Sequence, residues 1–197
     1  MKRGEKGAVL LVQAGRWMMT ELVDEGEARR CYEEALGLSP HDVEALRGLA
    51  GLEHADPKEL AAALENCLIH ETDPIERQGA MLRLGVLQMR ELEDLSAARE
   101  TFESLQRVLP DNQVVRVNLA SVYRRLGLNV ELAHLLAERF DDAKGARRAE
   151  LAVDIALIYR GEGDLDGAIY WWKRALSTGA RTELVHSELM GLYEAAG

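Results

Sequence analysis

Apolar side chains recur along most of the chain at the three- and four-residue spacing of an α-helix. Leu151, Ile155, Ile158 and Tyr159 illustrate the pattern, because positions i, i+4, i+7 and i+8 fall on one face of a helix. Between the turn signals, the sequence contains no run in which β-branched and polar residues alternate, which is the pattern of a half-buried strand. The pattern therefore predicts an all-α fold built from amphipathic helices.

Capping residues divide this pattern into short helices. Asp42 and the pair Asp56-Pro57 predict helix starts, because an aspartate side chain accepts hydrogen bonds from the unpaired amides of the first turn and proline suits the position after it. Gly127 and Gly163 predict helix ends. The segments between the predicted helices are short, which is typical of antiparallel neighbours.

Small residues recur along the chain with a period near 35 residues. The first series is Ala28, Ala62, Ala98, Ala133 and Ala168, and the second is Gly15, Ala50, Gly85, Ala120 and Ala156. A third series follows the first by 12 residues and consists mostly of helix breakers: Pro40, Pro74, Pro110, Gly145 and Ala180. This period predicts a solenoid, a stack of helix pairs whose small residues let the helices approach closely and whose surface is suited to binding.

The repeating unit resembles the tetratricopeptide repeat. The fifth repeat carries the resemblance most completely, with family-type small and aromatic residues in both of its helices: Ile155, Ala156, Tyr159, Gly163, Leu165, Ala168, Trp172 and Ala175. The second repeat matches least, because Glu53 and Asn66 stand where the family has aromatic residues. The resemblance implies a right-handed α-solenoid of about five helix-turn-helix repeats followed by a C-terminal helix.

The resemblance also implies boundaries and a class of function. It predicts a single superhelical domain over residues 1–197, with repeats at about 8–41, 42–76, 77–111, 112–147 and 148–181 and a terminal helix at 182–196. The leading interpretation is a scaffold or adaptor that binds a peptide or a partner protein in its concave groove. Two alternatives stay open: a structural unit that assembles with copies of itself, and a fragment of a larger multidomain protein.

The charge balance narrows the class of partner. The formal net charge is −10, so the surface as a whole repels nucleic acids and anionic membranes, and an RNA-binding helical repeat is disfavoured. No segment approaches the ~20 apolar residues that span a bilayer. Cys31 and Cys67 stand at non-equivalent positions of successive repeats, which predicts two free thiols rather than a disulfide. We therefore expect a cytoplasmic protein.

Candidate chemistry changes this picture little. The sequence contains no glycine-rich phosphate loop, no paired-cysteine metal motif and no His-Glu-x-x-His motif. His70 next to Glu71, and Asp141 next to Asp142, fit solvated helix ends better than a metal site or an acid–base pair. We therefore predict that the chain is not an enzyme, with no catalytic residues, no metal and no cofactor.

Members of the resembled family line their inner groove with the first helix of each repeat. Mapped by the resemblance, the groove residues are Arg47, Arg83, Arg90, Val117, Asn118, Ser121, Arg124, Arg125, Leu157 and Arg160, with His54 beside them. Arginine binds carboxylates through paired hydrogen bonds, so the expected ligand has an acidic or C-terminal segment. The alternative is that these arginines only pair with neighbouring carboxylates such as Glu91, Glu131 and Glu162.

Aromatic residues near the C-terminal end suggest a second surface. Trp172 falls on the packing position of its helix, so Tyr170 and Trp171 point away from that seam and form a candidate interface. The alternative is that they cover the neighbouring repeat or its loop. Trp17 is predicted to lie in the core of the first helix pair.

Overall fold

The computed structural model describes residues 3–52, 56–179 and 182–196. These residues form eleven α-helices and one π-helical turn and contain no strand, which confirms the all-α prediction. The chain divides into two compact units, Met1–Val115 and Arg116–Gly197. A single domain over residues 1–197 therefore stays a prediction. Ala180, which closes the third periodic series, and His54 lie outside the described residues.

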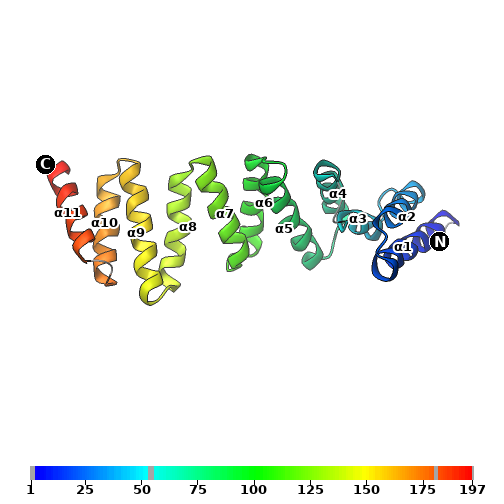
Figure 1. Cartoon of the computed structure of the whole chain (residues 1–197), viewed down its shortest axis with the longest axis horizontal. Helices are drawn as coiled ribbons and strands as arrows, with labels where there is room; N and C mark the ends of the chain where they lie inside the picture. The colour runs from blue at the N-terminus through cyan, green and yellow to red at the C-terminus, as the bar shows by residue number, and fades with distance from the viewer. Residues whose placement is uncertain (1–2, 53–55, 180–181, 197) are drawn as a thin grey trace. The chain divides into compact units, whose positions relative to one another are not determined.

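The first unit is a succession of short helices. They are α1 (Arg3–Trp17), the π-helical turn η1 (Met18–Leu22), α2 (Glu25–Leu38), α3 (Val43–Ala50), α4 (Pro57–His70), α5 (Pro74–Arg90) and α6 (Leu95–Val108). Each α-helix packs against the next one along the chain, and α1 also contacts α3 (Figure 1). The unit is thus built from helix hairpins, in which α1, α3 and α5 are the first helices and α2, α4 and α6 the second helices.

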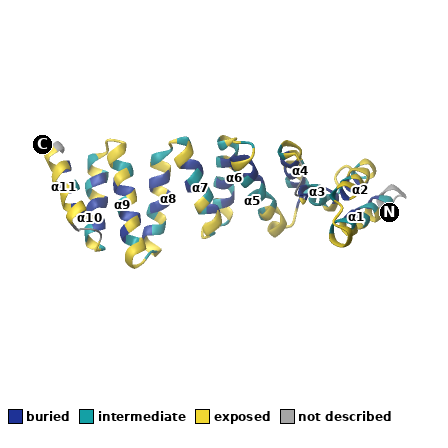
Figure 2. Ribbon diagram, in the orientation of Figure 1, coloured by how far each residue is buried: buried dark blue, intermediate teal, exposed yellow. Residues whose placement is uncertain are grey.

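The second unit continues the same alternation. Helix α7 (Gln113–Leu126) begins before its boundary, and α8 (Asn129–Asp142), α9 (Gly145–Gly161), α10 (Leu165–Ser177) and α11 (Thr182–Ala196) lie within it. Helices α8 to α11 each pack against the next, and Figure 1 shows α9, α10 and α11 side by side. Buried residues run as a stripe along α9 and α10, which is the amphipathic pattern expected of packed helices (Figure 2).

Aspartate caps begin many of the described helices, as the sequence predicts for α3 and α4. In each case an aspartate oxygen accepts a hydrogen bond from a backbone amide of the first turn; the capping residues are Asp24, Asp42, Asp56, Asp73, Asp94 and Asp164. An aspartate cap typically contributes about 1 kcal/mol. These local signals fix where the helices start.

The second helices share a register counted from these caps. The fourth, eighth and eleventh residues after the cap are buried, namely Ala28, Tyr32 and Ala35 in α2, Ala98, Phe102 and Leu105 in α6, and Ala168, Trp172 and Ala175 in α10. In α4 the same places are taken by Leu60, Leu64 and Cys67. The prediction that Ala62 packs at this seam is therefore wrong: Ala62 is exposed, because the Asp56 cap starts α4 two residues too early for it.

Glycines of α1 and α3 leave room for the ring of Tyr32, the aromatic residue of the first repeat. A Cβ atom on Gly15 of α1 would lie 2.7 Å from the Tyr32 ring, and one on Gly48 of α3 would lie 2.4 Å from it. Both distances are shorter than a carbon–carbon contact allows, so both positions require glycine while the Tyr32 ring stays where it is. The prediction that Gly15 permits close helix approach is confirmed.

Trp17 does not lie in the core of the first repeat. Helix α1 buries Ala8, Val12 and Gly15, which share one face. Trp17 lies two residues beyond Gly15, on the opposite side of the helix, and it is 54% exposed. The prediction of a buried Trp17 is therefore wrong.

Candidate functional site

The arginines that the sequence assigns to a groove have different surroundings in the first unit. Arg47 of α3 donates from Nε and Nη2 to Glu71 Oε2, at 2.6 and 2.5 Å, and from Nη1 to Glu44 Oε1 at 2.8 Å. Arg83 of α5 donates to the Leu52 carbonyl at 3.1 Å. Arg90, at the end of α5, is exposed. Arg47 therefore makes the intramolecular pairs that the sequence left as the alternative to ligand binding.

Glu71 is the buried partner in this contact. Its side chain is 2% exposed, it caps the end of α4, and its Oε1 accepts the Asp73 amide at 2.8 Å. Desolvation by burial raises the pKa of Glu71, but the hydrogen bonds from the Asp73 amide and from Arg47 outweigh it, so the pKa lies below its usual 4.5. The Arg47–Glu71 contact therefore links α3 to the end of α4 as a structural ion pair.

In the second unit, exposed apolar and basic residues lie on the first helices. Val117 of α7 is 50% exposed and Leu157 of α9 is 48% exposed. Arg124 and Arg125 are exposed at the end of α7, whereas Asn118 and Ser121 are partly buried. Arg160 of α9 forms an ion pair with Glu188 of α11. The predicted groove residues that are exposed in this unit are Val117, Arg124, Arg125, Leu157 and Arg160.

A groove separates α9 from α11. Its volume is about 380 Å³, and it is lined by Ala146, Ala149, Glu150, Val153 and Asp154 of α9, by Leu184 and Val185 of α11, and by Gly179. This volume lies within the range of ligand-binding pockets. Leu157 and Arg160, the groove residues that the sequence predicts on α9, do not line this groove, because its lining depends on how α11 packs, which no local pattern reports.

The aromatic pair of α10 is split between the core and the surface. Trp171 is buried and meets the Phe140 ring edge-on at 5.2 Å, whereas Tyr170 is 52% exposed. Trp171 therefore follows the alternative that the sequence left open, in which it covers the neighbouring repeat, because α10 packs this side chain against α8. Tyr170 as an interface residue stays a prediction.

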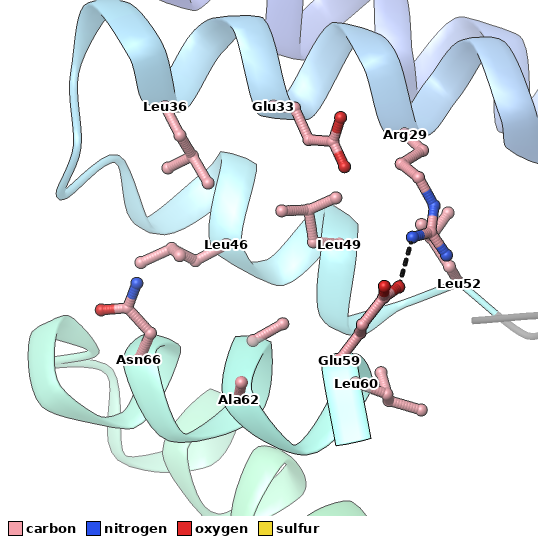
Figure 3. A pocket seen from close by; sticks show the side chains of 11 residues that line it. Arg29, Glu33, Leu36, Leu46, Leu49, Leu52, Glu59, Leu60, Ala62 and Asn66 are labelled. Carbon is pink, nitrogen blue, oxygen red and sulfur yellow. Dashed lines mark hydrogen bonds and ion pairs between the residues drawn. The ribbon is translucent and has the colours of Figure 1, made fainter. Parts of the chain in front are cut away.

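A second cavity lies in the first unit, among α2, α3 and α4 (Figure 3). Its volume is about 360 Å³, Leu36, Leu46 and Leu49 supply much of its apolar lining, and Arg29 pairs with Glu59 across it at 2.6 Å. Ala62 and Asn66 also line it. Small and polar residues of α4 are thus found at a cavity because the register of α4 places Leu60 and Leu64, rather than Ala62 and Asn66, in the seam.

Groups suited to catalysis or metal binding do not converge within the part of the chain that the structure describes. No three metal-ligating side chains come together among the described residues. Cys31 and Cys67 are both free thiols. The His41 and His70 rings lie 4.3 Å apart, without a third ligand in the described set. Among the described helices, none has the length and apolar character that crossing a membrane requires.

Comparison with known proteins identifies the fold. One structure of the protein MamA is 21% identical to this chain at a TM-score of 0.58, and the match covers 88% of this chain and 92% of MamA. A second MamA structure is 20% identical at a TM-score of 0.52, over 91% of this chain and 95% of MamA. YrrB, described as a TPR protein with an unusual peptide-binding site, shares 15% at a TM-score of 0.60, over 91% of this chain and 90% of YrrB. The chain has the tetratricopeptide-repeat fold. Neither the protein-family models nor the sequences of curated proteins provide a match.

The tetratricopeptide-repeat (TPR) fold assigns roles to the helices. The α9–α11 groove lies between the first helix of one TPR repeat and the helix that follows that repeat. Arg47, Arg83 and Arg90 belong to first helices of one unit, and Arg124, Arg125 and Arg160 to those of the other. The predicted groove residues are therefore distributed over two units, each with its own surface.

Proposed function

We propose that this TPR chain is a protein-interaction scaffold whose second unit binds an extended polypeptide segment along its first helices. The groove between α9 and α11 is the observation that carries the proposal, because it combines a volume of about 380 Å³ with an apolar lining. Leu184 of α11 is 41% exposed and Leu157 of α9 is 48% exposed. Exposed apolar positions next to a preformed groove are suited to anchoring a partner side chain.

The two acidic residues that line this groove favour a particular ligand chemistry. Arg147 engages Glu150 at 3.0 Å, while Asp154 is exposed on the same helix. A ligand that follows an apolar side chain with a lysine or an arginine would place its cation beside Asp154. Arg124 and Arg125 of α7 favour the acidic segment that the sequence predicts, so charge reversal at these two positions reports whether that part of the surface contributes.

Selection of peptides by phage display against the full chain, followed by calorimetric titration of the enriched peptides, tests this proposal. Leu184→Arg and Leu157→Asp are expected to weaken binding by about tenfold or more, since they place a charge where an apolar side chain docks. Ile75→Arg is the matched control, because Ile75 is 78% exposed in the first unit and far from the groove in sequence. Equal binding to all three variants would contradict the groove assignment.

Self-association is a second candidate, and exposed apolar residues of α11 favour it. Met190 is 64% exposed and Tyr193 is 50% exposed. Two copies that met through these residues would cover them both. Light scattering over a concentration series distinguishes the two: a mass that stays monomeric at high concentration contradicts self-association, and a dimer that dissociates in Met190→Glu supports it.

A further inference from the structure

An arginine-lined cavity opens where α8, α9 and α10 meet, within the second unit. It is lined by Phe140, Gly145, Arg148, Arg174, Ser177 and Thr178 and has a volume of about 380 Å³. The guanidinium carbons of Arg148 and Arg174 lie 4.4 and 4.5 Å from the centroid of the Phe140 ring. Two cations from different helices therefore converge on one aromatic side chain.

Aromatic neighbours hold Arg174 in place. Its guanidinium carbon lies 5.3 Å from the Trp171 ring centroid, and its Nη1 donates to the Tyr170 hydroxyl at 2.5 Å. These contacts reduce the rotamer freedom that an arginine normally loses when it binds a ligand. The tyrosine and tryptophan that the sequence marked as a candidate interface thus support an arginine, while Trp171 itself is buried.

The two arginines are only loosely neutralised. Asp141 Oδ1 lies 3.5 Å from Arg174 Nη2 and 4.0 Å from Arg148 Nη2, and the Asp141 side chain is 76% exposed. The Nε atom of Arg148 is buried without a hydrogen-bond partner among the described residues. Two guanidinium groups therefore share one solvated carboxylate at longer than ordinary hydrogen-bond distances.

Another arginine, Arg139, lies next in sequence to the Phe140 of this cavity, although the chain as a whole is acidic. Desolvation by burial lowers the pKa of Arg139, and the neighbouring charges of Arg147 and Arg116 lower it further. Arg139 lies near the end of α8, one residue from Phe140 and two from Asp141.

We propose that this cavity binds a carboxylate group of an acidic polypeptide segment. Asp141 already places a carboxylate within reach of both arginines, and the incoming group would replace it with closer, paired hydrogen bonds to the two guanidinium forks. The Phe140 ring covers one side of both guanidinium groups, which shields that side from water and strengthens an ion pair formed there. The inference rests on the proposed role in polypeptide binding, but it uses a surface of its own, on α8, α9 and α10 rather than on α9 and α11.

The probes are three fluorescein-labelled twelve-residue peptides: one of alternating glutamate and serine with an amidated C-terminus, the same peptide with a free C-terminus, and a neutral version with glutamine in place of glutamate. Fluorescence anisotropy at low salt is expected to show binding of the acidic peptides at least about tenfold tighter than binding of the neutral amidated peptide. Tighter binding of the free-acid peptide identifies the terminal carboxylate as the ligand, and equal binding of both acidic peptides identifies side-chain carboxylates; either result supports the proposal.

Variants of opposite expected sign make the test specific. Arg148→Gln and Arg174→Gln are expected to weaken acidic-peptide binding by about tenfold each, whereas Asp141→Asn, which removes the competing carboxylate, is expected to tighten it by about threefold. Arg107→Gln is the control for the same change of charge, because Arg107 lies on α6 in the first unit. Circular dichroism checks that each variant is folded.

Two outcomes would overturn the proposal. One is equal affinity for the acidic and the neutral amidated peptides, and the other is a loss in Arg107→Gln as large as in Arg148→Gln, since both would leave only non-specific attraction. Leu184→Arg separates this inference from the α9–α11 groove: it should leave acidic-peptide binding unchanged while it weakens binding of the display-selected peptides by about tenfold or more. Failure of the groove and failure of the cavity are therefore distinguishable.

Discussion

In the first unit, Arg47 pairs with a carboxylate that is 2% exposed, whereas in the second unit Arg148 and Arg174 share one that is 76% exposed. Glu71 also accepts a backbone amide, so its position is fixed from two directions. Asp141 faces solvent; the Phe140 ring contacts both arginines instead, and the rings of Trp171 and Tyr170 contact Arg174. The same chemical pair thus stabilises the fold in one region and leaves a binding surface accessible in the other.

The largest effect is expected at the rings of the second unit. Trp171→Ala should lower the free energy of unfolding by about 3–5 kcal/mol, because it removes a buried aromatic side chain from the contact with Phe140. Tyr170→Ala is the matched control and should cost under about 1 kcal/mol, since Tyr170 is half exposed. Urea unfolding followed by circular dichroism measures both, and equal effects would place Trp171 at the surface after all.

A smaller loss is expected at the buried carboxylate of the first unit. Glu71→Ala should lower the free energy of unfolding by about 2–4 kcal/mol, because it leaves Arg47 Nε and the Asp73 amide without their acceptor. Glu59→Ala removes an exposed partner of Arg29 and should cost under about 1 kcal/mol. Urea unfolding measures both variants. If Glu71→Ala lowers the free energy of unfolding no more than Glu59→Ala does, the buried Arg47–Glu71 pair does not stabilise the fold.

Acid should weaken the first unit through the same group. The pKa of Glu71 is lower in the folded chain than the ordinary 4.5, so its charged form contributes stability above that value and the contribution is lost as the pH falls through the lowered pKa. The wild type should therefore lose more stability between about pH 5 and pH 3 than Glu71→Gln does. Thermal unfolding of both proteins across this range measures the difference, and parallel curves would contradict it.

The smallest effect is expected at Asp141. Asp141→Asn should change the free energy of unfolding by less than about 0.5 kcal/mol, because exposed ion pairs contribute little. Urea unfolding at low salt is the measurement. A loss above about 1 kcal/mol would mean that Asp141 stabilises the fold as Glu71 does, and the contrast between the two units would disappear.

Sequence reasoning reached the fold because its signals are local or repeated. The aspartate caps at Asp42 and Asp56 act within one helical turn, and both are formed as predicted. The error at Ala62 came from giving the period precedence over the cap. The caps of α2, α4 and α6 lie at Asp24, Asp56 and Asp94, so the two intervals between them are 32 and 38 residues. Their mean equals the period of 35 residues, so the period does not reveal that α4 starts early.

The candidate sites depended on contacts that no pattern in a single sequence reports. Arg47 and Glu71 are 24 residues apart, and their pairing follows from how α3 meets the end of α4. Arg148 and Arg174 come from different helices and meet over Phe140 of a third. The two arginines of the proposed carboxylate site are therefore not among the arginines that the sequence assigned to the groove, and that assignment stays a prediction.

The register of α4 makes local opening of the first unit measurable through its cysteines. It places the Cys67 thiol in the seam with 1% exposure, whereas Cys31 of α2 is half-buried. Burial raises the pKa of both thiols, so both react slowly near neutral pH. A thiol reagent should modify Cys31 first and Cys67 only when α4 separates from its neighbours. The rate at which Cys67 is modified then measures how often α4 opens locally, without any introduced label.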